Sequence, residues 1–280
     1  MKRIYFIILM LAVNVDMAQN LRMITYNIRL NIASDGINAW PNRADQVSAL
    51  LDFHQAEIFG LQEAMYDQIQ DIEADLPKMK WVGVGRDDGQ KAGEFSPIFY
   101  DSEKFKALKN GGFWLSETPD KPSKGWDAAF NRVCTWVVLK EEKTGDKFMV
   151  FNTHFDHMGL KAKTESAKLI IQKIKELNND KLPVILMGDF NSTPDTEAYA
   201  TITGEMKDSR KVTKKAPYGP EGTFNSFNFN APMKERIDYV FVNDKLEVKR
   251  YAVLTDNKDQ RFPSDHQPVL VVLELKNGKK

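Results

Sequence analysis

Carboxylate, amide and imidazole side chains recur in this sequence where short apolar runs end. Glu63 follows Ile58–Leu61, and Asp189 and Asn191 follow Val184–Met187. Six further residues stand in similar places: Asn27, Asn152, His154, Asp238, Asp265 and His266. Mg²⁺ prefers such hard oxygen ligands, usually one or two carboxylates with water and substrate phosphate completing an octahedron. Hydrolysis of a phosphate ester also needs a positioned water and help for the leaving oxygen, and this set contains candidates for every part.

Each of these residues has a structural interpretation when it is taken alone. An Asp or Asn after a strand usually closes a turn, and a His there is usually only hydrogen-bonded. His154, Asp156 and His157 suggest zinc, but their spacing is irregular and no Cys or further His completes four ligands. Cys134 lies in an apolar run and is expected to be a small core residue. The combination of four carboxylates and two histidines is what favours a catalytic site.

The apolar runs that position these residues are predicted to be strands, because they are short and rich in Val, Ile, Phe and Tyr. They are Leu21–Tyr26, Ile58–Leu61, Phe148–Phe151, Val184–Met187, Ile237–Val242 and Pro268–Leu275. Apolar residues at helical spacing predict helices over 47–54, 69–76 and 167–177, the last with Thr164 as its N-cap. Each helix has one apolar stripe, so each is expected to cover one face of a sheet.

Two long polar segments, 85–97 and 208–235, contain several Gly or Pro residues and are predicted to be loops. Long loops in compact domains are often functional. Within the second loop, the aromatic run Thr223–Phe229 follows Lys211, Lys214 and Lys215, and could stack a base or a sugar. Packing of the same aromatic residues against a sheet is the structural alternative.

The charge balance and the N-terminal residues bear on partners and location. Lys+Arg and Asp+Glu both number 39 in 280 residues, so no global field draws the chain onto nucleic acid or anionic membrane. Lys2 and Arg3 precede the apolar stretch Ile4–Val13, which is too short to span a bilayer and typical of a signal peptide. A buried N-terminal strand is the structural alternative.

We therefore predict a signal peptide over residues 1–20 and export to the periplasm or the extracellular space. Residues 21–280 are expected to form a single catalytic domain without a transmembrane segment, because no linker or repeat divides them. No stable protein partner is predicted.

Six short motifs stand in a fixed order along residues 21–275. They are Thr25-Tyr26-Asn27, Leu61-Gln62-Glu63, Asn152-Thr153-His154-Phe155-Asp156, Gly188-Asp189-Phe190-Asn191, Arg236-Ile237-Asp238-Tyr239 and Ser264-Asp265-His266. In this order they resemble the endonuclease/exonuclease/phosphatase superfamily, which has a deoxyribonuclease I-like fold and includes nucleases, sphingomyelinases, inositol-polyphosphate phosphatases and deadenylases. The stretch Phe113–Pro119, followed by Lys124–Asp127, is similar to an exported bacterial branch. With the predicted strands and helices, the resemblance implies an α/β fold: a four-layer α-β-β-α sandwich of two packed mixed sheets flanked by helices.

The resemblance implies a divalent-metal site at Glu63, Asn27 and Asp265. Glu63 would be the main Mg²⁺ carboxylate, Asn27 would position metal or phosphate, and Asp265 would lie on the metal side. Mn²⁺ is the expected substitute for Mg²⁺.

The resemblance also implies the roles of the remaining site residues. Asp189 and Asn191 would orient the attacking water and the phosphate, and Asp189 is a candidate base. Asp238 would hold the ring of His266 and fix its tautomer. His154 would donate to a phosphoryl oxygen or to the leaving group. The identity of the general base stays open.

Arg132 and Asn152 are candidate substrate-binding residues. The planar guanidinium of Arg132 matches a phosphate, although a surface ion pair is an equal alternative. The chain is thus predicted to be a metal-dependent phosphoesterase acting on phosphodiesters, nucleic acid among them, or on phosphomonoesters. Lipid or sugar phosphates are alternative substrates. A non-catalytic binding module on the same fold is disfavoured because no central motif position is replaced.

Overall fold

The computed structural model describes residues 20–276. The signal peptide predicted over residues 1–20 lies outside the described residues, except for Asn20, which begins β1.

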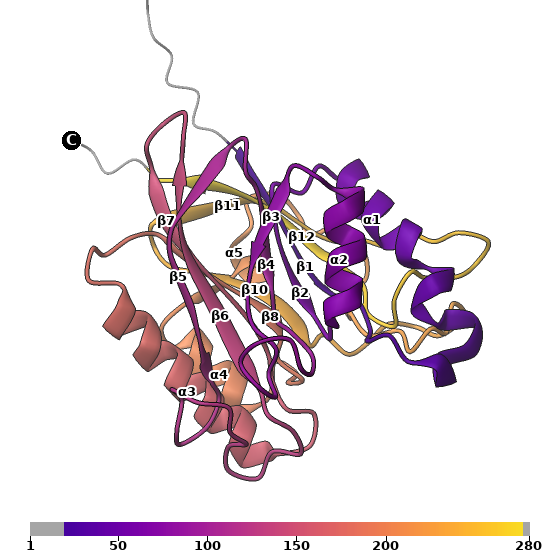
Figure 1. Ribbon diagram of the computed structural model, residues 1–280. Coiled ribbons are helices and arrows are strands. Elements are labelled where there is room, and N and C mark those ends of the chain that lie inside the picture. The colour runs from indigo at the N-terminus through magenta and orange to yellow at the C-terminus, as the bar shows by residue number, and fades with distance from the viewer. Residues whose placement is uncertain (1–19, 277–280) are drawn as a thin grey trace, which may run out of the picture.

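Two mixed sheets of six strands each form the centre of the molecule (Figure 1). The first sheet has the order β11-β12-β1-β2-β4-β3, with β1 Asn20–Asn27, β2 Ile58–Gln62, β3 Met79–Val82, β4 Ile98–Asp101, β11 Leu246–Val253 and β12 Val269–Leu275. The second has the order β5-β6-β7-β8-β10-β9, with β5 Phe105–Trp114, β6 Val133–Glu141, β7 Lys147–His154, β8 Val184–Asp189, β9 Lys207–Asp208 and β10 Asp238–Val242.

The two sheets repeat one pattern of strand directions. In the first sheet β1 and β2 are parallel, in the second β7 and β8 are parallel, and every other neighbouring pair is antiparallel. Parallel neighbours end at the same edge of a sheet, so each sheet brings two strand ends together at its centre.

Helices cover the outer faces of both sheets. Helices α1 (Ala44–Phe53) and α2 (Tyr66–Asp75) pack their apolar stripes on the first sheet, while α3 (Leu160–Leu177) and α4 (Glu197–Thr203) pack on the second. A third apolar cluster, drawn from both sheets, fills the space between them. The short helix α5 (Ser209–Val212) contacts β9, β10 and β11, and two 3-10 helices span Ala33–Asn38 and Trp40–Asn42. This arrangement confirms the predicted four-layer sandwich.

Helix α3 begins earlier than its sequence predicts. It starts at Leu160 with Gly159 as N-cap, so the predicted cap at Thr164 is wrong. The Asp127 carboxylate accepts hydrogen bonds from the backbone N–H groups of Lys161 (3.3 Å) and Ala162 (2.6 Å). A capping carboxylate at a distant sequence position satisfies the first turn, which local residue patterns do not reveal.

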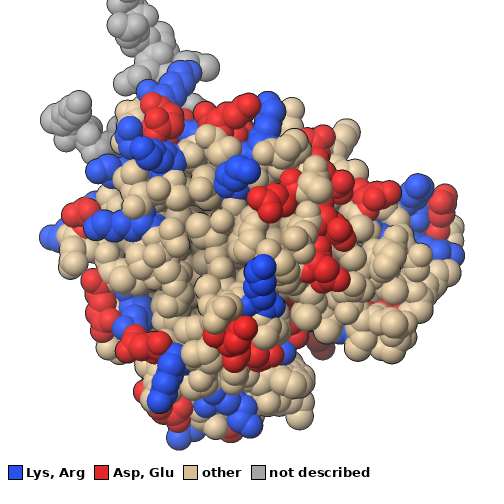
Figure 2. All heavy atoms as spheres, viewed as in Figure 1, with Lys and Arg blue, Asp and Glu red and all other residues tan. Residues whose placement is uncertain are grey.

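Acidic and basic side chains alternate over the face in Figure 2, where no continuous basic band is visible. Among residues 20–276, no helix has both the length and the hydropathy that crossing a membrane requires.

Candidate active site

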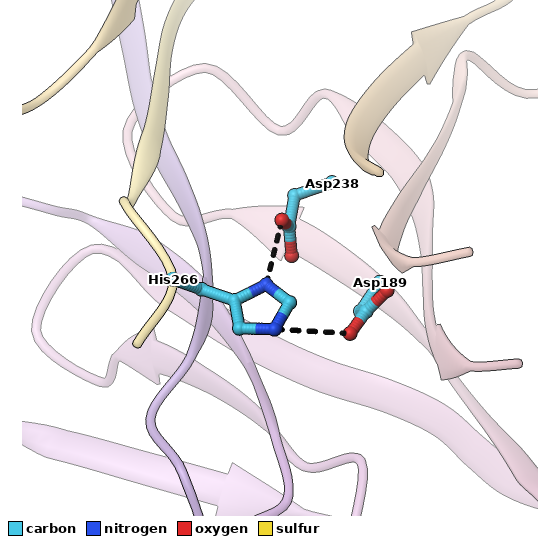
Figure 3. Close-up of side chains that lie close together, drawn as sticks. All are labelled: Asp189, Asp238 and His266. Carbon is cyan, nitrogen blue, oxygen red and sulfur yellow. Dashed lines mark hydrogen bonds and ion pairs between the residues drawn. The ribbon is translucent and has the colours of Figure 1, made fainter. Parts of the chain in front are cut away.

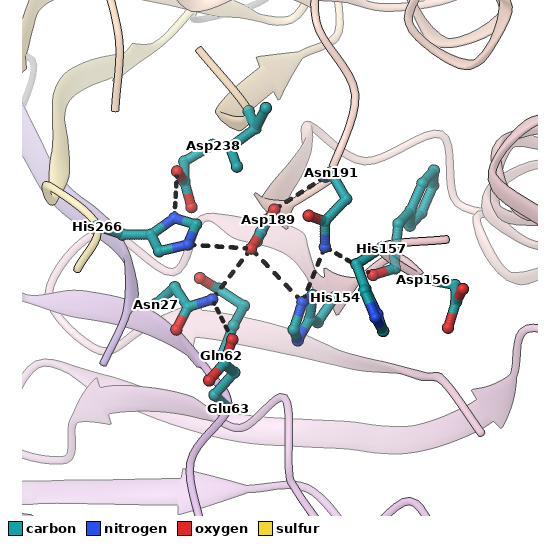
Figure 4. Close-up of polar contacts among 12 residues, drawn as sticks. Asn27, Gln62, Glu63, His154, Asp156, His157, Asp189, Asn191, Asp238 and His266 are labelled. Atoms are coloured by element: carbon teal, nitrogen blue, oxygen red, sulfur yellow. Dashed lines mark hydrogen bonds and ion pairs between the residues drawn. The ribbon is translucent and has the colours of Figure 1, made fainter. Parts of the chain in front are cut away.

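The site lies where the two central parallel strand pairs end. Asn27 is paired in register with Gln62 at the end of β1 and β2, and His154 with Asp189 at the end of β7 and β8. Each pair belongs to one sheet, and the packing of the sheets brings the two pairs face to face (Figure 4). The predicted residues from distant motifs therefore share one edge of the sandwich.

Asp189 is the point at which these groups converge. Its Oδ2 accepts a hydrogen bond from Asn27 Nδ2 of the opposite sheet (3.0 Å) and its Oδ1 accepts one from the backbone N–H of Asn191 (2.8 Å). The same Oδ2 lies 3.5 Å from Nε2 of His154 and 3.8 Å from Nε2 of His266. Burial and the neighbouring Asp238 raise the pKa of Asp189.

Asp238 holds the ring of His266. Its Oδ2 lies 2.9 Å from Nδ1 of His266, and both side chains are buried (Figure 3). Burial alone would lower the pKa of His266, but the carboxylates of Asp238 and Asp189 outweigh it and hold the pKa well above its ordinary value. His266 is therefore a cation that donates from Nδ1 to Asp238 and directs its Nε2–H toward Asp189.

His154 has the opposite electrostatic surroundings. A guanidinium can only donate hydrogen bonds, so Arg132 Nη1, at 3.0 Å, donates to Nδ1 of His154. Glu94 lies 3.7 Å from the same nitrogen, too far for a competing hydrogen bond. Burial, reinforced by the charge of Arg132, lowers the pKa of His154 to about 3. His154 is therefore neutral, with its hydrogen on Nε2, which lies 3.1 Å from the side-chain amide of Asn191 and 3.5 Å from Asp189 Oδ2.

Arg132 is buried, with 5% of its side chain exposed, and is ion-paired with Asp156 at 3.4 Å. Its guanidinium also lies 3.3 Å from Nδ1 of His157. This placement makes Arg132 a neighbour of the imidazoles, and a direct contact between Arg132 and substrate phosphate stays a prediction.

Asn152 lies beneath the site, between the two sheets. Its amide donates to the carbonyls of Leu61 and Pro97 (both 2.8 Å) and accepts from Nε2 of Gln62 (2.7 Å). A Cβ added at Gly60 would lie 2.6 Å from Cγ of Asn152, so this close approach of the sheets requires glycine. Asn152 thus cross-links the strands that carry the site, and its predicted contact with substrate stays a prediction.

Glu63, Asn27 and Asp265 are the residues that could hold a divalent cation. Asn27 Nδ2 lies 3.1 Å from Oε1 of Glu63. Burial and the nearby Glu63 carboxylate raise the pKa of Asp265, against the lowering effect of His266. Two acids that repel each other fit a hard cation, since a cation between them would relieve the repulsion. Asn27 turns its amide nitrogen to Glu63, while its Oδ1 accepts a hydrogen bond from the backbone N–H of Arg29 (3.0 Å), so Asn27 as a metal ligand stays a prediction.

A second group of possible ligands, Asp189, Asp238 and His266, has one atom of each within 4.8 Å of the others. Two of these atoms, His266 Nδ1 and Asp238 Oδ2, already share a hydrogen bond. A metal-bound imidazole must be deprotonated at the ligating nitrogen, whereas the carboxylates here keep His266 protonated. This trio therefore suits proton transfer better than metal binding.

Three residues at the site have left-handed backbone conformations that non-glycine residues seldom adopt. They are Arg29 (φ 56°), Glu63 (φ 58°) and Asn191 (φ 44°). Such conformations persist only where surrounding contacts enforce them, and they cluster at functional sites. At Glu63, the contact is a hydrogen bond from the backbone N–H of Leu30 to Oε2 (3.2 Å).

The sequence did not reveal Glu94 and Arg86, which form the outer part of the His154 surroundings. Arg86 Nη1 pairs with Oε2 of Glu94 at 2.6 Å, and Glu94 also lies 3.9 Å from Arg132. Both come from the predicted loop 85–97, and the length of that loop was the only signal.

The aromatic loop Thr223–Phe229 packs beside the other histidine. Phe224 meets the ring of His266 edge-on at 5.1 Å between centroids, and the guanidinium of Arg43 lies 5.7 Å from the ring of Phe227. Of the upstream lysines, Lys214 is ion-paired with Glu247 and Lys211 lies over the ring of Tyr199.

Known proteins resemble this chain over nearly its whole described length. The model of the Endonuclease/Exonuclease/phosphatase family matches residues 24–266. A Bacteroides thetaiotaomicron protein of that family has a solved structure that is 42% identical with a TM-score of 0.88, covering 92% of this chain and 98% of that one. A mannosyl-6-phosphatase from the same organism is 42% identical with a TM-score of 0.87, covering 90% and 99%.

More distant relatives include nucleases. The CCR4-Not complex 3'-5'-exoribonuclease subunit Ccr4 of Candida albicans is 27% identical over 232 residues, which cover 65% of this chain. The chain spans only 29% of that relative's length. The phosphatase and the nuclease among these relatives both act on phosphate esters. The chain therefore belongs to the endonuclease/exonuclease/phosphatase family and is a phosphoesterase.

Proposed function

We propose that this protein is an exported, Mg²⁺-dependent phosphatase that removes phosphate from sugar phosphates. We infer the substrate class from the arginines near the site, which already pair with carboxylates or backbone carbonyls of the protein. Arg29 pairs with Asp35, Arg86 with Glu94 and Arg132 with Asp156. Arg43 donates to backbone carbonyls only.

A polynucleotide substrate would need cations free to follow its backbone. The arginines around this site serve the protein instead, so the donors offered to substrate are the few that surround Asp189. This favours a compact ester with a single phosphate. The 42% identity to a mannosyl-6-phosphatase over 90% of the chain supports the same choice and points to a sugar as the alcohol.

The protonation states divide the chemistry among the residues. His266 is already protonated, and Nδ1 of His154 is occupied by Arg132, so neither imidazole can accept the proton of the attacking water. Asp189 is the remaining acceptor, and its raised pKa makes it a better base than an exposed carboxylate. The Nε2–H groups of His154 and His266 and the amide of Asn191 then donate to phosphoryl and leaving oxygens.

Glu63, Asp265 and Asn27 would hold the Mg²⁺, which supplies positive charge opposite the phosphoryl oxygens. The family is typically dependent on divalent metals. Oxygen-only ligands favour Mg²⁺ or Mn²⁺ over Zn²⁺, which prefers nitrogen and sulfur.

A panel of substrates tests the proposal. Purified protein is assayed with mannose 6-phosphate, glucose 6-phosphate, RNA, DNA, sphingomyelin and bis-nitrophenyl phosphate. We expect the highest kcat/KM on a sugar phosphate, loss of turnover in chelator, and recovery with Mg²⁺ or Mn²⁺. Faster cleavage of any diester would contradict the substrate class, and full activity in chelator would contradict the metal.

Glu63→Gln separates metal binding from folding. It keeps the side chain's size and one of the two oxygens that accept hydrogen bonds from Asn27 and Leu30, but it removes the negative charge, so we expect weaker Mg²⁺ binding by calorimetry in a protein that still folds. Asp45→Asn, on the exposed side of α1, is the matched control and should bind Mg²⁺ like the wild type.

The export proposal rests on Lys2, Arg3 and the apolar stretch that follows them. Expression of the full chain in a bacterial host, followed by cell fractionation and N-terminal sequencing, tests it. Processed protein outside the cytoplasm is expected, and an intact N-terminus in the cytoplasm would contradict export.

A further inference from the structure

Three large apolar side chains stand exposed beside the His154 half of the site. Phe130 is 50% exposed, Met158 is 67% exposed and Leu160 is 73% exposed. Phe130 belongs to the loop before β6, Met158 to the loop between β7 and α3, and Leu160 is the first residue of α3. Leu160 lines the hollow between α3 and α4, whereas Phe130 and Met158 are joined through Asp156, and we call these two residues the apolar shelf.

The shelf is held in place by one buried carboxylate. Oδ2 of Asp156 accepts a hydrogen bond from the backbone N–H of Phe130 (3.2 Å). Oδ1 accepts from the N–H groups of Met158 (3.0 Å) and Gly159 (2.9 Å). Both loops are thus fixed to the same side chain that pairs with Arg132. The shelf is therefore a constrained apolar surface beside the catalytic residues, where a ligand could pack on it.

The shelf connects to the catalytic imidazoles through His157. The ring of Phe130 lies nearly parallel to that of His157, with centroids 5.9 Å apart, and the guanidinium of Arg86 lies 5.1 Å from the Phe130 ring. Arg132 contacts Nδ1 of His157 as it contacts Nδ1 of His154. Because Arg132 can only donate, Nδ1 of His157 accepts this hydrogen bond, and the ring donates from Nε2, on the side away from Arg132. Figure 4 shows His157 beside His154 and Asn191.

We propose that the apolar shelf and His157 form the subsite for the alcohol part of the substrate, and that this alcohol is a pyranose sugar. This inference rests on the proposed function. A pyranose ring has a face of C–H groups that packs on apolar and aromatic side chains, and hydroxyls that need hydrogen-bond partners. The shelf can pack against the C–H face of the ring, and Nε2–H of His157 can donate a hydrogen bond to a hydroxyl. An acyl chain would leave the His157 donor unused.

Phe130→Ala and Met158→Ala test the subsite by comparing a ring alcohol with an open-chain one. The substrates are mannose 6-phosphate and glycerol 3-phosphate, which present the same phosphate on different alcohols. We expect each variant to raise KM for the pyranose about fivefold to tenfold, the size of one lost aromatic or apolar contact. The kinetics on glycerol phosphate and inhibition by inorganic phosphate should stay unchanged, and Phe130→Trp should retain the wild-type KM.

Phe53→Ala is the matched control. Phe53 is 79% exposed and, like Phe130, packs against a histidine, with its ring 5.3 Å from that of His54. It ends α1, beside the hollow of about 500 Å³ that is lined by residues such as Asn20 and Glu57, where β1 and β2 begin. This is the end of the sandwich opposite the catalytic residues, so its loss should change neither substrate's kinetics.

The outcomes separate the two proposals. If wild-type protein cleaves diesters but not sugar phosphates, the proposed function fails and the sugar subsite fails with it. If wild-type protein cleaves mannose 6-phosphate and the shelf variants lose nothing, or lose equally on both substrates, only the subsite is refuted.

Discussion

His154 and His266 flank one carboxylate, Asp189, and both are buried, yet their charges differ. His154 faces a guanidinium and its pKa falls to about 3, whereas His266 faces two carboxylates and its pKa rises well above the ordinary value. Burial acts in the same direction on both rings, so it cannot explain the difference. The neighbouring charges decide it.

The difference shows how one residue type can supply two kinds of donor. A neutral imidazole with its hydrogen fixed on Nε2 donates a hydrogen bond without adding charge. A protonated imidazole adds charge and can release a proton to a leaving oxygen. The partner on Nδ1 sets the role in each case: Arg132 for His154 and Asp238 for His266.

The largest effect is expected from removing the charged histidine. His266→Ala should lower kcat by about 10²–10⁴-fold, the range of a positioned acid or base. Steady-state kinetics at saturating Mg²⁺ measures this, with His54→Ala as control, because His54 pairs with Asp256 away from the site. A loss below tenfold would show that the charge of His266 is not used.

Asp238→Asn should make His266 resemble His154. Without the carboxylate that raises it, the His266 pKa falls, because burial then dominates. The protonated form is lost at lower pH, so the alkaline limb of the kcat profile should move to lower pH. An unmoved alkaline limb would show that His266 does not define it.

Arg132→Gln should reduce the difference between the pKa values of the two histidines by raising that of His154. Glutamine can still donate to Nδ1 of His154 but lacks the charge that lowers the His154 pKa, so this pKa should rise above about 3. Titration of the His154 ring by NMR measures the shift. An unchanged value would mean that burial alone sets it, since burial is the larger of the two causes.

The smallest effects are expected on the free energy of unfolding, where His154 and His266 lose their contributions in opposite directions of pH. His154 resists protonation when folded, so its contribution is complete above the unfolded pKa near 6.5 and is lost as pH falls toward 3. His266 gains a proton when folded, so its contribution is complete below that pKa and is lost as pH rises through its higher folded pKa.

Each slope is at most about 1.4 kcal/mol per pH unit. Urea unfolding of metal-free protein at several pH values should show a flatter acid side in His154→Gln and a flatter alkaline side in His266→Gln. The same slope in a variant and in wild type would assign the pH dependence to other groups.

Much of the architecture could be predicted because it depends on local patterns. Short apolar runs predicted β1, β2, β7, β8, β10 and β12 but not β4 or β6, and the polar residues beside these runs predicted which groups meet at one edge. The edge strand β5 was missed because its exposed face carries Lys106, Lys109 and Asn110 among few apolar residues. The early start of α3 depends on the Asp127 cap.

The electrostatic contrast between the histidines could not be predicted in the same way. It arises from Arg132 and Asp238, each of which meets its histidine only after folding, across 22 and 28 residues of sequence. The resemblance implied a donor role for His154 and a ring held by Asp238 for His266, and it left open which group is the base. The motif that contains Asn152 did not reveal that its side chain also links the two sheets, through hydrogen bonds to the carbonyls of Leu61 and Pro97.

The left-handed conformation of Glu63 has a consequence for the history of this fold. A non-glycine residue with φ of 58° destabilises the folded chain by about 1–2 kcal/mol relative to glycine. The hydrogen bonds that Glu63 accepts from Asn27 and Leu30, together with its proposed metal, offset this cost, whereas glycine would adopt the conformation without strain. A gene copy released from catalysis should therefore drift to glycine or asparagine at this position early, which would mark it as a descendant that kept the sandwich and gave up the reaction.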